Sequence, residues 1–128
     1  RNSTMKKILL VITIFFGLVC SSCAQNAQYT SLNNKEFAKV VKQKKAQVVD
    51  VRSTAEFTTG HLAKAVNIDV NCKDFGRQIE KLNKKKPVAV YCRSGRRSKI
   101  AAQQLADKGF KVYELDKGIQ QWDGEIVH

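Results

Sequence analysis

Several features are scarce in this sequence of 128 residues. It has one proline and seven glycines, and no segment repeats with a period of 20–50 residues. Collagen-like, proline-rich and solenoid architectures are therefore excluded. Four cysteines are too few for a disulfide-dense scaffold. Acidic residues number 11 against 23 Lys and Arg, so the net charge is +12. A basic excess of this kind suits nucleic acids, anionic membranes or anionic substrates as partners.

The N-terminal segment carries a long apolar run. Lys6 and Lys7 precede residues 8–19, which are apolar except for one Thr and one Gly. These 12 residues fall short of the roughly 20 that a membrane-spanning helix requires. The basic flank, the apolar run and the small residues that follow are typical of a secretory signal. We therefore predict a signal peptide over 1–23 and an exported, periplasmic protein.

Two processing routes fit the end of this signal. Ser22-Cys23-Ala24 matches the small-x-small pattern of ordinary signal peptidase. Ser22-Cys23 also resembles the end of a bacterial lipobox, in which Cys23 would be lipidated and become the first residue. The usual lipobox has an aliphatic residue where this chain has Cys20. We favour the lipoprotein, whose acylated Cys23 would anchor the domain to a membrane.

The rest of the chain divides into a tether and one domain. Residues 24–30 are polar and predict a short tether. Residues 31–128 are enough for one modest hydrophobic core. After removal of 1–23 this part keeps two cysteines, Cys72 and Cys92, and 20 basic residues against 11 acidic ones.

Helical and strand patterns alternate along the domain. Asn33 followed by Glu36 is typical of a helix start, and short β-branched runs predict buried strands. We expect helices at 34–43, 54–59, 74–82, 98–108 and 118–122, and strands at 46–51, 65–68, 87–91 and 111–115. Because no two strands are joined by a hairpin turn, the pattern predicts an α/β fold. We expect a central parallel sheet of about five strands with helices on both faces.

Cys92 directly follows the strand predicted at 87–91, which has the clearest strand pattern in the chain. In parallel sheets, ligand sites lie beyond the carboxyl ends of the strands, so Cys92 is at such an end. The free amides and the dipole of the following helix favour an anion. Arg93, Arg96 and Arg97 add positive charge, and Gly95 lets the backbone curl closely around the sulfur. Together these features should lower the pKa of Cys92 and make its thiolate a nucleophile. We predict Cys92 as the catalytic residue, with a small anion bound by Arg93, Ser94, Gly95, Arg96 and Arg97.

Five motifs occur in a fixed order along the chain. They are D-V-R at 50–52, E-F-x-x-G-H-L at 56–62, A-V-N-I at 65–68, Y-C-R-S-G-R-R-S at 91–98, and the closing pattern from Gly109 to Trp122. In these motifs the chain resembles the rhodanese family of single-domain sulfurtransferases, over roughly residues 31–124. One departure is Lys117, where the family commonly has a glycine.

The resemblance implies a reaction that the Cys92 loop allows. The Cys92 thiolate would take the outer sulfur of thiosulfate or a similar donor, release sulfite and become a persulfide. A thiol or cyanide would then remove the sulfur. The resemblance implies no metal and no organic cofactor.

For the other motif residues we expect supporting or structural roles rather than catalytic ones. Asp50, Arg52, Glu56 and His61 are candidates for contacts that support the loop. For Arg52 we favour a structural ion pair with an acid, and for His61 a structural role in the turn. Cys72 follows a strand end and is a candidate to approach Cys92 as a disulfide or resolving partner.

Two other functions compete with sulfur transfer. A phosphatase on this architecture would need an arginine at position 98, where the chain has Ser98. A persulfide carrier or redox-linked binding module would need Cys92 but would turn over slowly with thiosulfate. Nucleic-acid binding is disfavoured, because the basic residues are scattered and no aromatic residues are interleaved with them.

Overall fold

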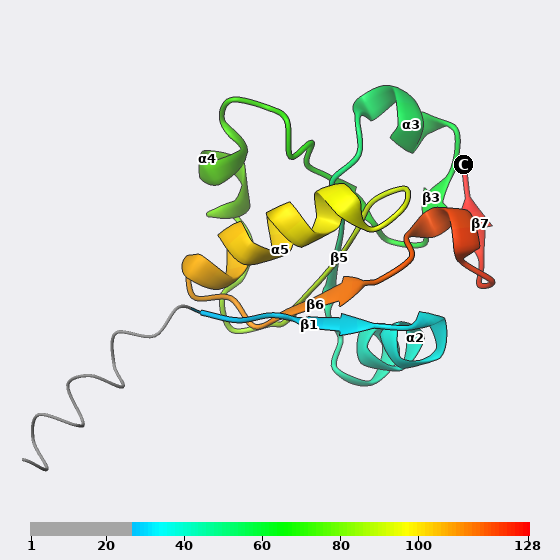
Figure 1. The fold of residues 1–128 in the computed structure, drawn as a ribbon, viewed down its shortest axis with the longest axis horizontal. Coiled ribbons are helices and arrows are strands. Elements are labelled where there is room, and N and C mark those ends of the chain that lie inside the picture. The colour runs from blue at the N-terminus through cyan, green and yellow to red at the C-terminus, as the bar shows by residue number, and fades with distance from the viewer. Residues whose placement is uncertain (1–26) are drawn as a thin grey trace, which may run out of the picture.

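The computed structural model describes residues 27–128, and Figure 1 shows their arrangement. The predicted signal peptide, with Cys23, lies outside this part of the chain. Five parallel strands form the central sheet. In spatial order they are β1 (Thr30–Leu32), β6 (Val112–Leu115), β5 (Val88–Tyr91), β2 (Gln47–Asp50) and β4 (Val66–Asn67). The predicted parallel α/β sheet is confirmed.

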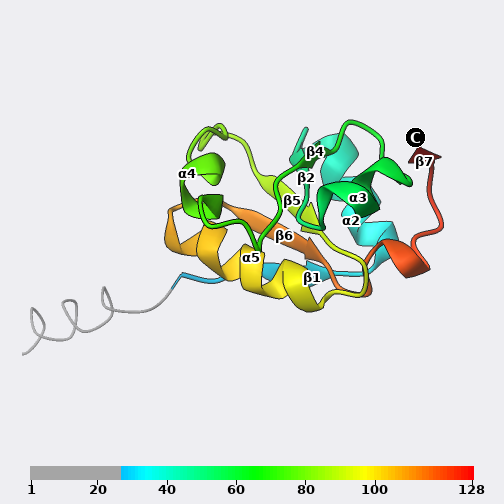
Figure 2. The ribbon, with the colours of Figure 1, turned by 90° about the horizontal axis from the view of Figure 1, so that it is seen from above.

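Helices pack on both faces of this sheet. They are α2 (Asn34–Gln43), α3 (Thr54–Thr58), α4 (Phe75–Ile79), α5 (Arg96–Asp107) and a 3-10 helix η1 (Ile119–Gln121). Figures 1 and 2 show α2 on one side of the sheet and α4 and α5 on the other. In the described part of the chain, no helix has the length and apolarity needed to cross a membrane.

The alternation of side chains along each strand divides the core into two clusters. On the α4 and α5 side, Val49 and Val90 pack with Ile79 and Leu105. On the α2 side the cluster contains Phe37, Val48, Leu62, Ala89, Tyr91 and Leu115. Strands buried on both faces need apolar residues at every position, which explains the continuous runs seen in the sequence.

Some elements differ from the predicted ones. Thr30, which was assigned to the tether, begins β1, and its partner Tyr113 lies 83 positions along the chain. A second, antiparallel sheet joins β3 (His61–Leu62) to β7 (Ile126–Val127). Strands of two or three residues are too short to show a period in the sequence. The helix expected over 74–82 shortens to α4.

The most important boundary difference is at α5. The helix begins at Arg96, two residues before the predicted start. Arg96 and Arg97 therefore lie in its first turn, and Gly95 precedes it with a φ of 101°. The loop that carries Cys92 is consequently very short.

Candidate active site

Cys92 lies directly after β5 and is 0% exposed. The backbone N–H of Gly95 donates to its Sγ at 3.1 Å. Sγ also lies 3.4 Å from Oγ of Ser98, which is itself 0% exposed. The sulfur thus sits inside the turn that leads into α5, as the sequence predicted.

Opposing effects act on the Cys92 thiol. Burial raises its pKa, whereas hydrogen bonding of the thiolate with the Ser98 side chain and with the backbone N–H groups of Ser98, Gly95 and Ser94 lowers it. The hydrogen bonds outweigh burial, so the pKa lies below its ordinary value. The predicted direction is right, and the main sources are Ser98 and the amides at the start of α5, with none of the three arginines among them.

The arginines have different roles. Arg97 forms a bidentate ion pair with Glu56, with Nη1–Oε1 and Nη2–Oε2 distances of 2.7 and 2.9 Å. The Arg97 hydrogen bond lowers the pKa of Glu56 to about 2. Arg93 and Arg96 are exposed, and within residues 27–128 neither is in an ion pair. They are therefore the guanidinium groups left to meet an incoming anion.

Asp50 and Arg52 form a buried ion pair, with Arg52 Nη2 2.7 Å from Asp50 Oδ2. The same Arg52 nitrogen donates to the Gly60 carbonyl at 2.7 Å. His61 stacks on Phe57 with ring centroids 3.9 Å apart. These contacts link the end of β2 to the 60–61 turn, as expected for structural roles.

Residues 118–120, which follow β6, contact the backbone of the Cys92 loop and hydrogen-bond to it. Ile119 N–H donates to the Cys92 carbonyl at 2.9 Å, and Gln120 N–H to the Arg93 carbonyl at 3.1 Å. Gly118, at a φ of 71°, packs so closely that a Cβ there would lie 2.2 Å from the Arg93 carbonyl oxygen. This segment is not among the predicted site residues, although it belongs to the closing motif from Gly109 to Trp122.

A buried carboxylate lies behind Cys92. Glu114 of β6 is 0% exposed. It accepts hydrogen bonds from Ser98 Oγ at 2.5 Å, from Ser31 Oγ at 2.6 Å and from Lys99 Nζ at 3.3 Å. Glu114 is not among the predicted site residues, and the available signal is an acid in the middle of an apolar strand.

The second cysteine of the domain is exposed. Cys72 and Cys92 are both free thiols, so the structure contains no disulfide between them. Among residues 27–128, no three His, Cys, Asp or Glu side chains are grouped to bind a metal ion.

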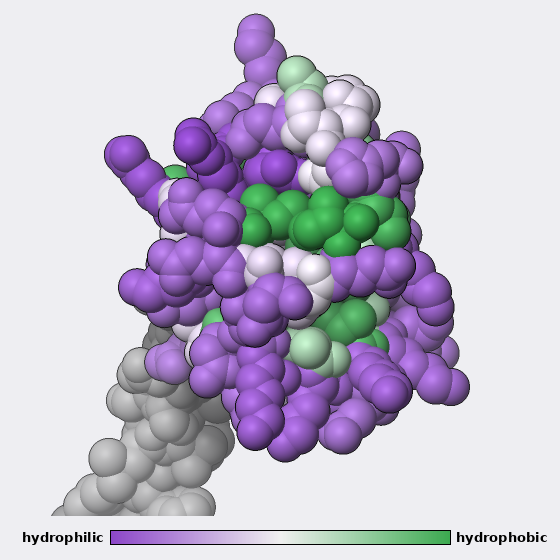
Figure 3. Space-filling view, turned by 90° about the vertical axis from the view of Figure 1, so that its right-hand side faces the viewer, coloured by the Kyte–Doolittle hydropathy of each residue, from purple (hydrophilic) through white to green (hydrophobic). Residues whose placement is uncertain are grey.

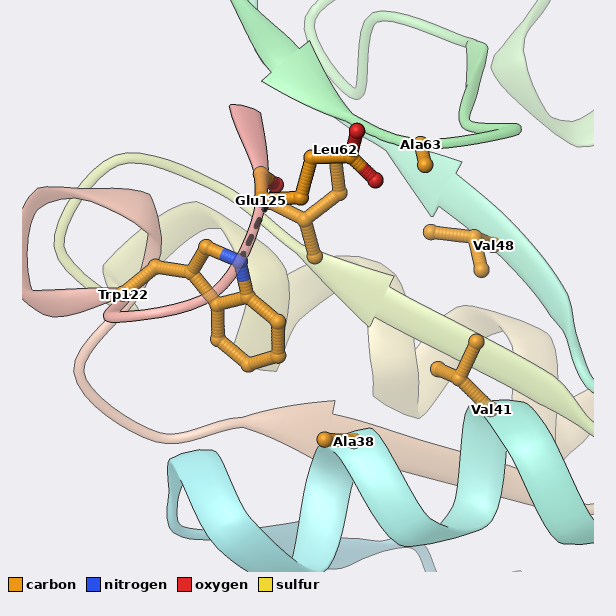
Figure 4. Close-up of a pocket in the computed structure, with 7 residues that line it drawn as sticks. All are labelled: Ala38, Val41, Val48, Leu62, Ala63, Trp122 and Glu125. Carbon is orange, nitrogen blue, oxygen red and sulfur yellow. Dashed lines mark hydrogen bonds between the residues drawn. The ribbon is translucent and has the colours of Figure 1, made fainter. Parts of the chain in front are cut away.

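An apolar pocket of about 150 Å³ lies between α2, β2 and Trp122 (Figure 4). Its lining residues are Ala38, Val41, Val48, Leu62, Ala63, Trp122 and Glu125. None of them belongs to the Cys92 loop, and the lining offers no cation for an anionic donor. An apolar band also crosses the hydrophilic surface at the β7 and α2 end of the molecule (Figure 3). The geometry therefore favours the Cys92 loop over this pocket as the candidate active site.

Comparison with known proteins agrees with this geometry. Thiosulfate sulfurtransferase GlpE of Coxiella burnetii is 34% identical over 95 residues, which cover 73% of this chain and 87% of that protein. The uncharacterized protein YqhL of Bacillus subtilis is 30% identical over 125 residues, covering 97% of this chain and 96% of that protein. A tRNA uridine(34) hydroxylase of Pelagibacter ubique is 37% identical over 105 residues, but the match spans only 34% of the hydroxylase.

The fold comparison gives the same result. The crystal structure of a rhodanese-related protein from Thermoplasma volcanium matches with a TM-score of 0.70 and 28% identity, covering 77% of this chain and 98% of that one. The model of the rhodanese-like domain matches residues 33–125. The resemblance seen in the sequence motifs is thus confirmed, and the chain belongs to the rhodanese-like domain family.

Proposed function

We propose that this protein is a sulfurtransferase that carries sulfane sulfur as a persulfide on Cys92. The observation that carries the proposal is the position of Sγ, which lies at a strand end and accepts a hydrogen bond from Gly95 N–H at 3.1 Å. A thiol with a lowered pKa, enclosed by backbone donors, is suited to nucleophilic attack on sulfur.

In the first half-reaction the Cys92 thiolate attacks the outer sulfur of thiosulfate. A new S–S bond forms, the bond between the two donor sulfurs breaks, and sulfite leaves with the electron pair. The terminal sulfur of the persulfide then carries the negative charge. Backbone N–H groups at the start of α5 are oriented to stabilise an anion in this place.

In the second half-reaction an acceptor removes the terminal sulfur. A thiolate or cyanide attacks it, the persulfide S–S bond breaks, and Cys92 recovers its electron pair as a thiolate. Cyanide becomes thiocyanate, and a thiol becomes a persulfide. The covalent intermediate divides the overall transfer into two simpler displacements.

The exposed arginines act in donor binding, before the sulfur is transferred. Arg93 and Arg96 attract the donor anion to the loop, whereas Arg97 remains bound to Glu56. Ser98 occupies the position where a phosphatase of this architecture would need an arginine. A sulfur-containing anion is therefore the better substrate.

Burial of Cys92 favours a second candidate function. Because the thiol is 0% exposed, a donor reaches it only when the loop opens. A partner protein that opens the loop would make the chain a persulfide carrier, with slow turnover on free thiosulfate. Turnover with thiosulfate and cyanide, compared with single sulfur loading, separates the two functions.

Mass spectrometry of the purified protein tests the proposal. Thiosulfate should add one sulfur to the Cys92 peptide, and cyanide should remove it. Cys92→Ser should lose both loading and thiocyanate formation while keeping its circular dichroism spectrum, because a hydroxyl matches the thiol in shape but forms no persulfide. Cys72→Ser is the matched control and should load normally. Sulfur found on the Cys72 peptide alone would refute the assignment.

Export is a further part of the proposal. Residues 1–23 would direct the chain across a bacterial inner membrane, and acylated Cys23 would anchor the domain in the periplasm. Wild-type protein should fractionate with membranes, and Cys23→Ala should be soluble or unprocessed. Equal solubility of both in the periplasm would favour ordinary cleavage after Ala24, and a wholly cytoplasmic protein would refute export.

A further inference from the structure

A continuous chain of buried polar atoms leads from Cys92 to Glu114. Cys92 Sγ lies 3.4 Å from Ser98 Oγ, and Ser98 Oγ lies 2.5 Å from Glu114 Oε2. All three residues are 0% exposed. Water therefore does not compete for these contacts, and the few available protons must be shared among the buried groups.

The Ser98 hydroxyl has only one proton to share. It donates this proton to Glu114, so its oxygen is left to face the Cys92 sulfur as an acceptor for the S–H group. A Cys92 thiolate would instead need the same proton as a donor. The carboxylate of Glu114 and the thiolate of Cys92 thus compete for one hydroxyl.

We propose that Glu114 is a positioning residue of the sulfur site, which holds the Ser98 hydroxyl and thereby limits how readily the Cys92 thiol ionises. The loop amides favour the thiolate, and Glu114 opposes them. This opposition keeps the pKa of Cys92 from falling too far, which favours reactivity because the intrinsic nucleophilicity of a thiolate falls as its pKa falls. A thiol that ionises near the ambient pH attacks a sulfur donor fastest.

The polar and charged groups around Glu114 come from three elements. Ser31 of β1 donates to Oε1, and Lys99 of α5 lies 3.3 Å from Oε2. Lys99 also pairs with Asp116, which follows β6, at 2.9 Å. Arg97 is the nearby cation on the Cys92 side, since the negative charge of Cys92 contributes to the raised pKa of Arg97. Lys99 is the other donor to Oε2, and its contact of 3.3 Å is longer than the 2.5 Å contact from Ser98.

Glu114→Gln is the decisive variant. It removes a buried negative charge within about 6 Å of Sγ, the reach of the two consecutive contacts. The new amide can donate to Ser98 Oγ, which frees the hydroxyl proton for the thiolate. Both changes favour ionisation, so the pKa of Cys92 should fall further and the midpoint of its alkylation profile should move to lower pH.

The readout is the pH dependence of iodoacetamide alkylation, followed by mass spectrometry of the Cys92 peptide. It requires no sulfur donor, although the inference rests on Cys92 being the reactive thiol of the proposed function. Glu80→Gln is the matched control, because Glu80 is a lysine-paired carboxylate at the surface. This control should leave the alkylation profile unchanged.

A double-mutant cycle tests whether the effect passes through Ser98. In a Ser98→Ala background, Glu114→Gln should shift the profile by less than half as much, because no hydroxyl remains to be released. An equal shift in both backgrounds would overturn the role of Ser98, and no shift in the single variant would overturn the role of Glu114. If Glu114→Gln fails to fold, Glu114→Asp serves instead, because its shorter side chain withdraws from Ser98 and should shift the profile in the same direction.

The two proposals fail in different ways. Absence of a persulfide together with the expected alkylation shift would refute sulfur transfer but not the role of Glu114. Normal persulfide loading with an unshifted profile would refute the role of Glu114 alone.

Discussion

Replacing Glu56 by Gln should destabilise the protein in a pH-dependent way. Glu56 has two roles, since it pairs with Arg97 and also closes the capping box of α3 with Ser53. A glutamine oxygen can still accept from the Ser53 N–H, so the cap remains. The substitution therefore isolates the charge that holds Arg97 beside the Cys92 loop.

The size of the effect follows from the ion pair. The pKa of Glu56 falls from 4.5 to about 2, mainly through the Arg97 hydrogen bond. A difference of this size corresponds to a ceiling of about 3 kcal/mol of stabilisation. The Arg97 and Glu56 side chains are 27% and 32% exposed, so screening by solvent reduces the value to about 1–2 kcal/mol.

The sign of the pH dependence is determined by the lowered pKa. The ionised carboxylate is favoured in the folded state, so its contribution is complete above a pH of about 4.5. It is lost as the pH falls from about 4.5 to about 2, where the folded carboxyl takes up its proton. The free energy of unfolding of wild type should therefore exceed that of Glu56→Gln at pH 7, and the difference should shrink across this window.

Urea unfolding at several pH values measures this difference. Glu80→Gln, at an exposed lysine pair, should leave the free energy of unfolding at pH 7 close to that of wild type. A difference between wild type and Glu56→Gln that is the same at pH 7 and near pH 3 would refute the ion-pair reasoning, as would no difference at pH 7.

Two further predictions concern the Cys92 loop. Gly118→Ala should cost about 2–4 kcal/mol in urea unfolding and slow persulfide formation, because its Cβ would meet the Arg93 carbonyl. Gly109→Ala is the control, since Gly109 also has a positive φ but no atom lies within 4 Å of the added Cβ. This variant should lose only about 1 kcal/mol of the free energy of unfolding. Equal losses in the two variants would show that the contact with the Arg93 carbonyl is not the cause. Arg93→Ala and Arg96→Ala should raise the KM for thiosulfate several-fold at low salt, and the effect should shrink at about 0.5 M salt. Arg77→Ala controls for net charge, and unchanged KM values in both loop variants would show that neither arginine attracts the donor.

Local patterns in the sequence were sufficient to place Cys92, the proposed nucleophile, at the end of a strand. The apolar run over 88–91 predicts a buried strand, and the residues after Cys92 predict a helix start. The carboxyl end of a parallel strand faces the ligand edge of the sheet wherever the strand lies. The position of Cys92 could therefore be predicted without knowing the strand order, and the parallel sheet followed from the alternation of elements.

The partners of the loop could not be predicted in the same way. Arg97 reads as an anion-binding residue in the sequence, yet it pairs with Glu56, 41 positions away. Whether a guanidinium meets a substrate or an internal carboxylate depends on which helices the fold brings together. Of the effects expected to lower the pKa of Cys92, the backbone amides do so, whereas none of the three arginines is among the main causes.

The sequence by itself determined the class of fold, the family and the position of the candidate cysteine at a strand end, because these depend on short-range periodicity and on ordered motifs. Only the tertiary structure placed Glu114 and Gly118 against the Cys92 loop, and Ser31 against Glu114 from 83 positions away. Contacts of this kind arise when parallel strands align in register, and the register is set by packing over the whole sheet. The hydrogen-bond donors to Sγ are consequently local to the Cys92 loop and the start of α5, whereas the buried carboxylate behind Ser98 and the glycine packed against Arg93 come from the assembled fold.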